Sequence, residues 1–255
     1  MNGHLSGYER SAHLYDLFDS KENVDFFGHY AALVGEILDI GAGTGRVAMP
    51  LAERGIRLVC VEPSPAMRDV FEKKLDRRPD LRDRITLVPC DAASFHLERT
   101  FRAAFLSGTF DHFLDPAERL SSLQNIARHL GPGGILVFDV FLGLMDDSPL
   151  TPAGRVQRAD REYRRLVGRR AVSGHQVQVQ LIFEIYENDE LVERIEQQSI
   201  AGIVDRGQVH DLLAQVGFSV RGEFSDYDFT PYRAGDELLI VDAVHQFGDM
   251  RRRGG

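Results

Sequence analysis

The sequence predicts a doubly wound α/β fold, in which helices cover both faces of a mainly parallel β-sheet. Short apolar runs such as RLVCVE at 57–62 have the composition of buried parallel strands. They alternate with amphipathic stretches of about ten to fifteen residues, the pattern of right-handed β-α-β crossovers. The last two apolar runs, 218–224 and 237–245, are joined by a long loop, which indicates a hairpin that adds an antiparallel strand.

Each element has its own signal in the chain. A strand at 37–40 opens the fold and ends at a glycine-rich turn. The helix expected at 65–75 has Pro65 at its start, where the missing proline N–H costs nothing. The helix expected at 116–130 carries an apolar stripe and ends in the turn GPGG. The remaining expected elements are strands at 85–91, 102–107 and 134–141 and helices at 47–54 and 205–216.

The segment between the fifth strand and the last helix has a different pattern. A Pro/Gly-rich stretch at 143–154 precedes residues 162–200, where alternating apolar and polar residues predict antiparallel strands with a turn at Asn188–Asp189. No internal repeat or low-complexity tract marks a second domain. We therefore expect one domain over 1–255 with a β insertion at about 145–203, which either covers the active site or forms a homodimer contact.

Composition excludes several classes of function. The formal net charge of −9 argues against the basic surface of a nucleic-acid-binding protein. No apolar run approaches the roughly 18 residues of a membrane helix, and the first residues lack the apolar core of a secretion signal. Cys60 and Cys90 lack the spacing of a disulfide framework or a metal site. We expect a cytoplasmic protein with no membrane or nucleic-acid partner and no bound metal.

The stretch ILDIGAGTGR at 37–46 indicates a ligand site, because it places three glycines within five residues directly after a strand. Glycine lacks a Cβ and adopts positive φ, so the backbone can turn tightly against a ligand. In a doubly wound sheet such a turn lies beyond the carboxyl ends of the strands, where the strand order switches and ligands bind. A dinucleotide fingerprint would need a third glycine where the chain has Arg46.

Two acidic residues at the ends of neighbouring strands restrict the class of ligand that this site can bind. Glu62 ends the second strand, where a carboxylate can accept two hydrogen bonds from a ribose diol. This position excludes a 2′-phosphate but leaves both NAD and an adenosyl ligand possible. Asp91 follows the third strand, where it can accept a hydrogen bond from an adenine amino group.

Six segments in this order resemble the class I S-adenosylmethionine-dependent methyltransferases: ILDIGAGTGR, VEPSPAM, CDA, LSGTFDH, RHLGPGGILVFDV and LLAQVGF. The resemblance covers about residues 8 to 247 and is specific for the superfamily but not for a substrate. It implies a Rossmann-like seven-stranded sheet whose last strand is antiparallel. It also implies S-adenosyl-L-methionine as cofactor and S-adenosyl-L-homocysteine as product.

The resemblance also assigns cofactor contacts. The methionine part would lie against the glycine loop, the ribose on Glu62, the adenine between Pro63 and Met67 with its edge at Asp91, and the sulfonium near Ser107. For Arg46 a bond to the cofactor carboxylate and a surface role at the helix start stay open. The full set of implied cofactor-binding residues is Tyr15, Asp39, Gly41, Ala42, Gly43, Gly45, Arg46, Glu62, Pro63, Met67, Asp91, Ala92, Ser107 and Gly108.

Catalysis is expected from His112 and Tyr15. His112 follows the fourth strand by a few residues, and an imidazole titrates near neutral pH, which suits a general base or a substrate contact. The alternative is a histidine that packs or caps before the helix at Pro116, and Asp111 could orient the ring or the substrate. Tyr15 lies on N-terminal lid helices expected over about 1–35, where it would contact cofactor or substrate or only anchor the helix.

Two further segments leave alternatives open. Tyr227, Phe229 and Tyr232 could form an aromatic wall for an apolar substrate or pack their own long loop. The arginines of REYRRLVGRR at 161–170 could face an acidic acceptor or form a charged edge strand, the simpler interpretation.

The leading hypothesis is an enzyme of secondary or amine metabolism that transfers a methyl group to an N, O or C atom of a small molecule. The alternatives are an RNA or protein methyltransferase, a non-catalytic cofactor-binding subunit, and, last, a nicotinamide dehydrogenase. The acidic charge and the SGTF sequence after the fourth strand count against a macromolecular substrate.

Overall fold

The main sheet has seven strands, and the order of the strands places a switch point beside β1. The computed structural model describes residues 8–18, 21–142 and 147–246. Its strand order is β10-β11-β5-β4-β1-β2-β3, with only β11 antiparallel to its neighbours β5 and β10. The strands are β1 (Glu36–Ile40), β2 (Arg57–Val61), β3 (Ile85–Val88), β4 (Phe101–Leu106), β5 (Leu130–Phe141), β10 (Phe218–Phe224) and β11 (Leu238–His245). This arrangement confirms the predicted fold class.

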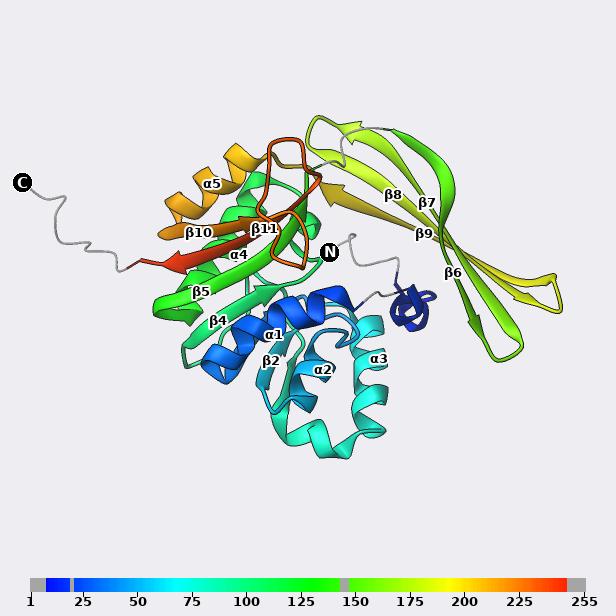
Figure 1. The fold of residues 1–255 in the computed structure, drawn as a ribbon, viewed down its shortest axis with the longest axis horizontal. Coiled ribbons are helices and arrows are strands. Elements are labelled where there is room, and N and C mark those ends of the chain that lie inside the picture. The colour runs from blue at the N-terminus through cyan, green and yellow to red at the C-terminus, as the bar shows by residue number, and fades with distance from the viewer. Residues whose placement is uncertain (1–7, 19–20, 143–146, 247–255) are drawn as a thin grey trace, which may run out of the picture.

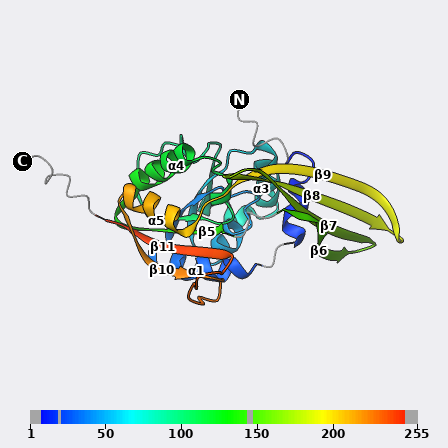
Figure 2. The same cartoon turned by 90° about the horizontal axis from the view of Figure 1, so that it is seen from above.

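Helices cover both faces of this sheet and enclose two apolar cores. On one face lie α1 (Glu22–Val34), α2 (Ala48–Glu53) and α3 (Pro65–Asp76), and on the other α4 (Pro116–His129) and α5 (Arg206–Gln215). Figure 2 shows α4 and α1 on opposite sides of the strands. Alternate residues of each strand face opposite sides, so Ile37 packs with the first group of helices and Leu38 with the second.

Local sequence determines where the helices begin. The Ser64 hydroxyl accepts a hydrogen bond from the Met67 amide at the start of α3, and Pro65 occupies the first turn. At α4 the Asp115 carboxylate accepts from the Glu118 amide at 2.8 Å. Because β2 and β4 are both parallel to β1, the loops that lead to these two helices lie at the same edge of the sheet.

A second sheet of four antiparallel strands follows β5. It consists of β6 (Ser148–Arg158), β7 (Arg161–Ser173), β8 (Gln176–Glu187) and β9 (Glu190–Gly202), in that order. The turn at Asn188–Asp189 joins β8 and β9 as predicted. The Pro/Gly-rich stretch was expected to precede the strands, but β6 already begins at Ser148. Proline is tolerated there because β6 is an edge strand, whose outer N–H groups need no partner.

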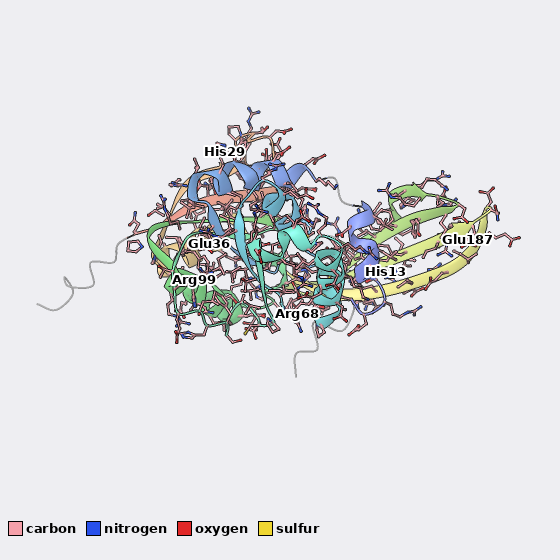
Figure 3. The ribbon with its side chains drawn as sticks, turned by 90° about the horizontal axis from the view of Figure 1, so that it is seen from below. His13, His29, Glu36, Arg68, Arg99 and Glu187 are labelled. Atoms are coloured by element: carbon pink, nitrogen blue, oxygen red, sulfur yellow. The ribbon has the colours of Figure 1, made fainter. Side chains whose placement is uncertain are left out.

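The N-terminal part connects the two sheets. It contains the 3-10 helix η1 (Ala12–Phe18) followed by α1. Figure 1 shows η1 between α3 and the second sheet, and Figure 3 shows the sheet extending from His13 on η1 to Glu187 at its far end. Parts of the predicted lid segment (1–7) and of the predicted insertion (143–146) lie outside the described residues. Within the described ranges, no helix has the length and apolar character to cross a bilayer.

Candidate functional site

A cavity of about 550 Å³ opens at the carboxyl ends of β1, β2 and β4. Its position is the switch point predicted from the alternation of strands and helices. The volume falls within the roughly 300–1,000 Å³ of small-molecule sites. The predicted cofactor residues line it with the exception of Gly45, and so do Tyr15 and His112.

The three glycines of the loop have different neighbours. All have positive φ, at +69° for Gly41, +57° for Gly43 and +77° for Gly45. A Cβ on Gly41 would lie 2.3 Å from Thr109 Oγ1, and one on Gly45 would lie 2.3 Å from the Phe71 ring. A Cβ on Gly43 would have no neighbour closer than 4.0 Å. Gly43 therefore faces the cavity. Gly45 packs against Phe71 of α3 and does not line the cavity, although it was expected in the wall around the cofactor.

Glu62 is buried at the end of β2 and is held by two backbone N–H groups. Its Oε2 accepts from the Gly43 amide and its Oε1 from the Ser64 amide, each at 2.8 Å. Burial raises the pKa of Glu62, and these hydrogen bonds oppose that effect. Each carboxylate oxygen retains a further lone pair, so a ribose diol can still donate to both.

Asp39 offers a buried carboxylate at the end of β1. Its side chain is 3% exposed and lines the cavity, and Oδ2 has no hydrogen-bond partner among the described residues. Burial raises the pKa of Asp39 to about 7, an effect that nearby Arg46 opposes. An unpartnered buried carboxylate oxygen is costly unless a ligand supplies a donor. The ammonium group of the methionine part of S-adenosylmethionine is such a donor.

Ser107, directly after β4, lies at the centre of a polar network. Its Oγ accepts from Asn23 Nδ2 at 2.8 Å and from Arg46 Nη2 at 3.1 Å. The next residue, Gly108, donates its amide to the buried Asp139 at 2.6 Å. Arg46 is thus half-buried and turned toward the cavity, which favours the interpretation as a ligand contact over the surface role.

The residues predicted to contact the adenine come after β2 and β3. Pro63 and Met67 line one wall, and Asp91 and Ala92 line another. Asp91 Oδ1 accepts the amides of Ala93 and Ser94 at 3.0 and 2.9 Å, which fixes the carboxyl group in its turn. The carboxylates of Glu62, Asp91 and Asp39, which are predicted to accept from the ribose, the adenine edge and the ammonium group, therefore line one cavity, and their chemistry fits an adenosyl amino acid.

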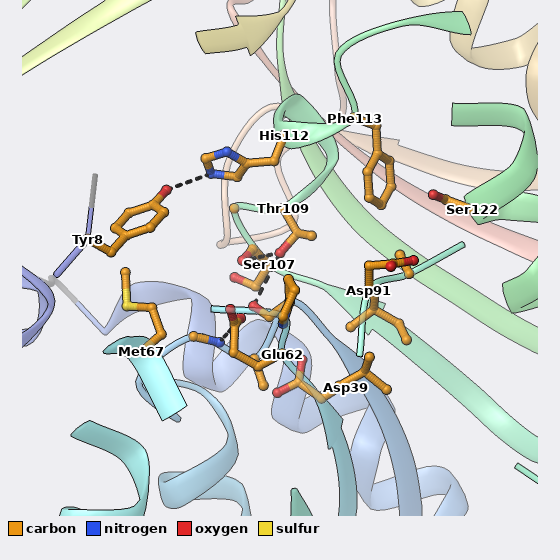
Figure 4. Close-up of a pocket in the computed structure, with 18 of the residues that line it drawn as sticks. Tyr8, Asp39, Glu62, Met67, Asp91, Ser107, Thr109, His112, Phe113 and Ser122 are labelled. Carbon is orange, nitrogen blue, oxygen red and sulfur yellow. Dashed lines mark hydrogen bonds between the residues drawn. The ribbon is translucent and has the colours of Figure 1, made fainter. Parts of the chain in front are cut away.

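His112 and Tyr8 meet across the cavity. Tyr8 Oη lies 3.4 Å from His112 Nε2, and in Figure 4 this pair and Asp39 lie on opposite sides of Glu62. The imidazole is accessible from within the cavity but surrounded by protein, and this desolvation lowers its pKa. His112 is therefore neutral at neutral pH and able to accept a proton. Asp111 does not line the cavity; its carboxylate accepts from the Phe141 amide of β5.

Tyr15 joins the N-terminal helix to the second sheet. Its hydroxyl accepts from Gln197 Nε2 at 3.2 Å, and its ring contacts Tyr8 edge to face with centroids 5.4 Å apart. Burial raises the pKa of both phenols, so both remain protonated donors. Tyr15 lines the cavity and also anchors η1, so its contact with cofactor or substrate stays a prediction.

Several lining residues were not predicted from sequence. They are Tyr8, Thr44, Phe113, Asp115, Glu118, Ser122 and Ile200, among others. Ile200 comes from β9, whose contact with the cavity depends on tertiary structure that no local pattern records. A signal did exist for Asp115 and Glu118, because they form the predicted start of the helix at 116–130 beside His112.

The aromatic loop after β10 packs rather than binds. Phe229 stacks on Phe26 with centroids 4.4 Å apart, and Tyr227 donates to Asp139 at 2.8 Å. Neither residue lines the cavity, and neither do the arginines of β7. Arg165 lies over the Phe18 ring instead. Among the described residues, no group of His, Cys, Asp and Glu side chains could hold a metal ion.

Comparison with known proteins agrees with this site. Residues 37–134 match the family model described as a methyltransferase domain. The chain is 31% identical over 214 residues to the cypemycin N-terminal methyltransferase of Streptomyces sp., covering 80% of this chain and 81% of that one. It is 35% identical over 105 residues to an uncharacterized methyltransferase of Mycobacterium tuberculosis, covering 41% of this chain and 39% of the relative.

Solved structures share the fold. An S-adenosylmethionine-dependent methyltransferase from Clostridium acetobutylicum superposes with a TM-score of 0.77 at 17% identity, covering 94% of this chain and 99% of the other. The sugar N-methyltransferase KedS8 from Streptoalloteichus sp. superposes with a TM-score of 0.70 at 22% identity, covering 91% and 92%. The cavity, the hydrogen-bond acceptors that line it and these relatives lead to one conclusion: the chain belongs to the class I S-adenosylmethionine-dependent methyltransferases and takes its methyl group from that cofactor.

Proposed function

We propose that this methyltransferase acts on an amine nitrogen of a small molecule. The observation that carries the proposal is the charge of the cavity around the neutral His112. Five carboxyl groups line the cavity, those of Asp39, Glu62, Asp91, Asp115 and Glu118, against one guanidinium, that of Arg46. Such a lining attracts cationic ligands, and amines are cations in water at neutral pH.

The names of similar proteins support an amine. The 31% identical relative is named for the N-terminus of cypemycin. Neighbours in fold include a sugar N-methyltransferase, an amino pentose methyltransferase and a glycopeptide N-methyltransferase. These names concern those proteins, and they make amines the first acceptors to test.

The residues have distinct roles in this proposal. S-adenosylmethionine supplies an activated methyl group on a sulfonium, so the protein contributes alignment and exclusion of water. Glu62 would hold the ribose of the cofactor and Asp39 the ammonium group of its methionine part. His112 Nε2, in place of its contact with Tyr8, would take a proton from the bound ammonium and so free the nitrogen lone pair. The lone pair then forms the N–C bond as the C–S bond of the sulfonium breaks, which leaves the neutral thioether of S-adenosylhomocysteine.

The second sheet has the role of a cover in this proposal, within one domain that includes both sheets. β9 contributes Ile200 to the cavity, and Gln197 contacts Tyr15. These contacts favour covering the site over forming a homodimer contact.

The first experiment is calorimetric titration with S-adenosylmethionine and S-adenosylhomocysteine, with NAD as the control. Transfer of a labelled methyl group is then measured to an aminosugar, a short peptide with a free N-terminus and a phenol. Transfer to either amine, with loss of transfer when that amine is acetylated, supports the proposal. Transfer only to the phenol would refute the amine proposal and leave the cofactor assignment intact.

A further inference from the structure

Helix η1 is bound by polar contacts to two parts of the molecule that lie far apart in the sequence. In Figure 1 it is the short dark-blue helix between α3 and the second sheet. Its side chains Leu14, Leu17 and Phe18 face the second sheet. They cluster there with Phe183, Ile185 and Ile195. Its polar contacts reach the glycine loop and α3 on one side, and β9 of the second sheet on the other.

On the cofactor side the contact is the carboxylate of Asp16. Oδ1 accepts from Thr44 Oγ1 at 2.6 Å, and Oδ2 pairs with Lys74 Nζ of α3 at 2.7 Å. Thr44 lies between Gly43 and Gly45, is buried and lines the cavity. Asp16 itself does not line the cavity, so its contact with the cofactor loop is indirect.

On the other side the contact is the amide of Gln197 in β9. Gln197 is 2% exposed, so its amide needs partners within the protein. Both partners are on the N-terminal segment: the Ser11 hydroxyl donates to Oε1, and Nε2 donates to Tyr15 Oη. Three residues further along β9, Ile200 lines the cavity.

The glycines make the Thr44 contact sensitive to the cofactor. Gly43 and Gly45 are the residues with most backbone freedom, and a ligand packed against Gly43 restricts that freedom. Once Thr44 is fixed, the contact with Asp16 costs less ordering entropy, and the same holds for the contacts of η1 with β9. Tyr15 and Asp16 are adjacent, so fixing Asp16 also fixes the phenol that faces the cavity.

We propose that Asp16 and Gln197 are positioning residues that couple the glycine loop to β9 through η1, so that binding of the cofactor orders the cover over the acceptor side. Neither residue need touch the cofactor or the acceptor. That the ordered cover lies over the acceptor rests on the proposed function, whereas the coupling itself depends only on the cofactor site.

The test is hydrogen exchange by mass spectrometry on the full chain, with S-adenosylhomocysteine as the probe at saturating concentration. In the unsubstituted protein the probe should slow exchange about tenfold in peptides covering 8–18 and 190–202. A peptide over α5, far from η1, reports any global stabilisation. Asp16→Ala should bind the probe about tenfold more weakly and, when saturated, lose the slowing at 190–202.

Two variants complete the design. Gln197→Ala keeps the Asp16 contacts, so the probe should still slow exchange at 8–18 but not at 190–202. Asp25→Ala is the matched control, because Asp25 is an exposed carboxylate of α1 that pairs with Arg54 away from η1; its pattern should equal that of the unsubstituted protein. If Asp16→Ala does not fold, Asp16→Asn replaces it. This variant keeps an acceptor for Thr44 but loses the charge that pairs with Lys74, so the slowing at 190–202 should be partly lost.

Probe-induced slowing at 190–202 that survives in both the Asp16 and the Gln197 variants would overturn the coupling. The coupling would also be overturned if the probe failed to slow exchange at 190–202 in the unsubstituted protein. A merely structural role would lower the melting temperature of the variants and leave the probe-induced difference intact. None of these results involves an acceptor, so they separate failure of the coupling from failure of the proposed amine.

Discussion

The Tyr8 hydroxyl lies 3.4 Å from Nε2 of His112, although 104 residues separate the two in the chain. The phenol remains protonated because burial raises its pKa, and the imidazole remains neutral because desolvation lowers its own. Two neutral groups that can share a hydrogen bond thus meet in the cavity. Their protonation states give the enzyme a definite pH dependence.

For His112 we predict loss of activity toward low pH. The neutral imidazole is the competent form, so kcat should fall as the pH drops through its lowered pKa, below the ordinary value of about 6.5. His112→Ala should leave binding of S-adenosylmethionine unchanged, reduce kcat by roughly 10²-fold and remove this acid limb. A pH–kcat profile of the two proteins checks this, and an unchanged acid limb in the variant would assign the titration to another group.

For Asp39 we predict affinity for S-adenosylmethionine that rises with pH. Its pKa is about 7, and the cationic ammonium of the ligand binds the ionised form, so the affinity should increase from pH 6 to pH 8. Asp39→Asn should weaken binding at pH 8 and remove the pH dependence. Calorimetry at three pH values measures both effects.

The same carboxyl group should reduce the stability of the free protein at high pH. Its folded pKa lies above the unfolded value of 3.8, so the folded state binds more protons between these values and stability falls as pH rises through them. Asp39→Asn should therefore raise the free energy of unfolding above pH 7, by on the order of 2 kcal/mol. Equal stability of the two proteins at pH 8 would contradict the burial of an ionised Asp39.

Substitutions at two neighbouring glycines should separate binding from stability. Gly43→Val places its side chain toward the cavity and should reduce affinity for S-adenosylmethionine by roughly 100-fold or more, about 3 kcal/mol. Gly45→Ala meets the Phe71 ring and should lower the free energy of unfolding by about 1–3 kcal/mol. Denaturation and calorimetry on both variants check the contrast. If Gly43→Val binds normally, the methionine part does not lie against this loop.

Glu62→Ala should weaken S-adenosylmethionine binding by about 1–3 kcal/mol, because charge-assisted hydrogen bonds to the ribose are lost. Glu72→Ala on α3 serves as a control, since Glu72 pairs with Arg82 at the surface. Equal affinities of these two variants would place the ribose elsewhere.

Most of the fold could be predicted because its strands are short apolar runs and its helices have clear starts. The start of β6 could not be predicted, because prolines are typical of loops and their presence in an edge strand has no distinct sequence pattern. For the site, Asp39 lies near the carboxyl end of β1, and Gly43 and Glu62 follow β1 and β2; the carboxyl ends of these parallel strands must meet. Which side of the loop each glycine faces is decided by neighbours such as Phe71 and Thr109, and no local pattern shows that. The contributions of Tyr8 and Ile200 depend on contacts between distant parts of the chain.

Both ends of the second sheet's segment meet at the short helix η3 (Phe110–His112). Where the chain leaves the main sheet, Phe141 donates its amide to Asp111, and where it returns, Gly202 lies against the backbone of Phe113 and Leu114. A segment whose ends are already close can be exchanged for one of another length at little cost in loop closure. Acceptor preference could therefore diverge by replacement of one continuous piece of chain, without altering the strands and loops that hold the methyl donor.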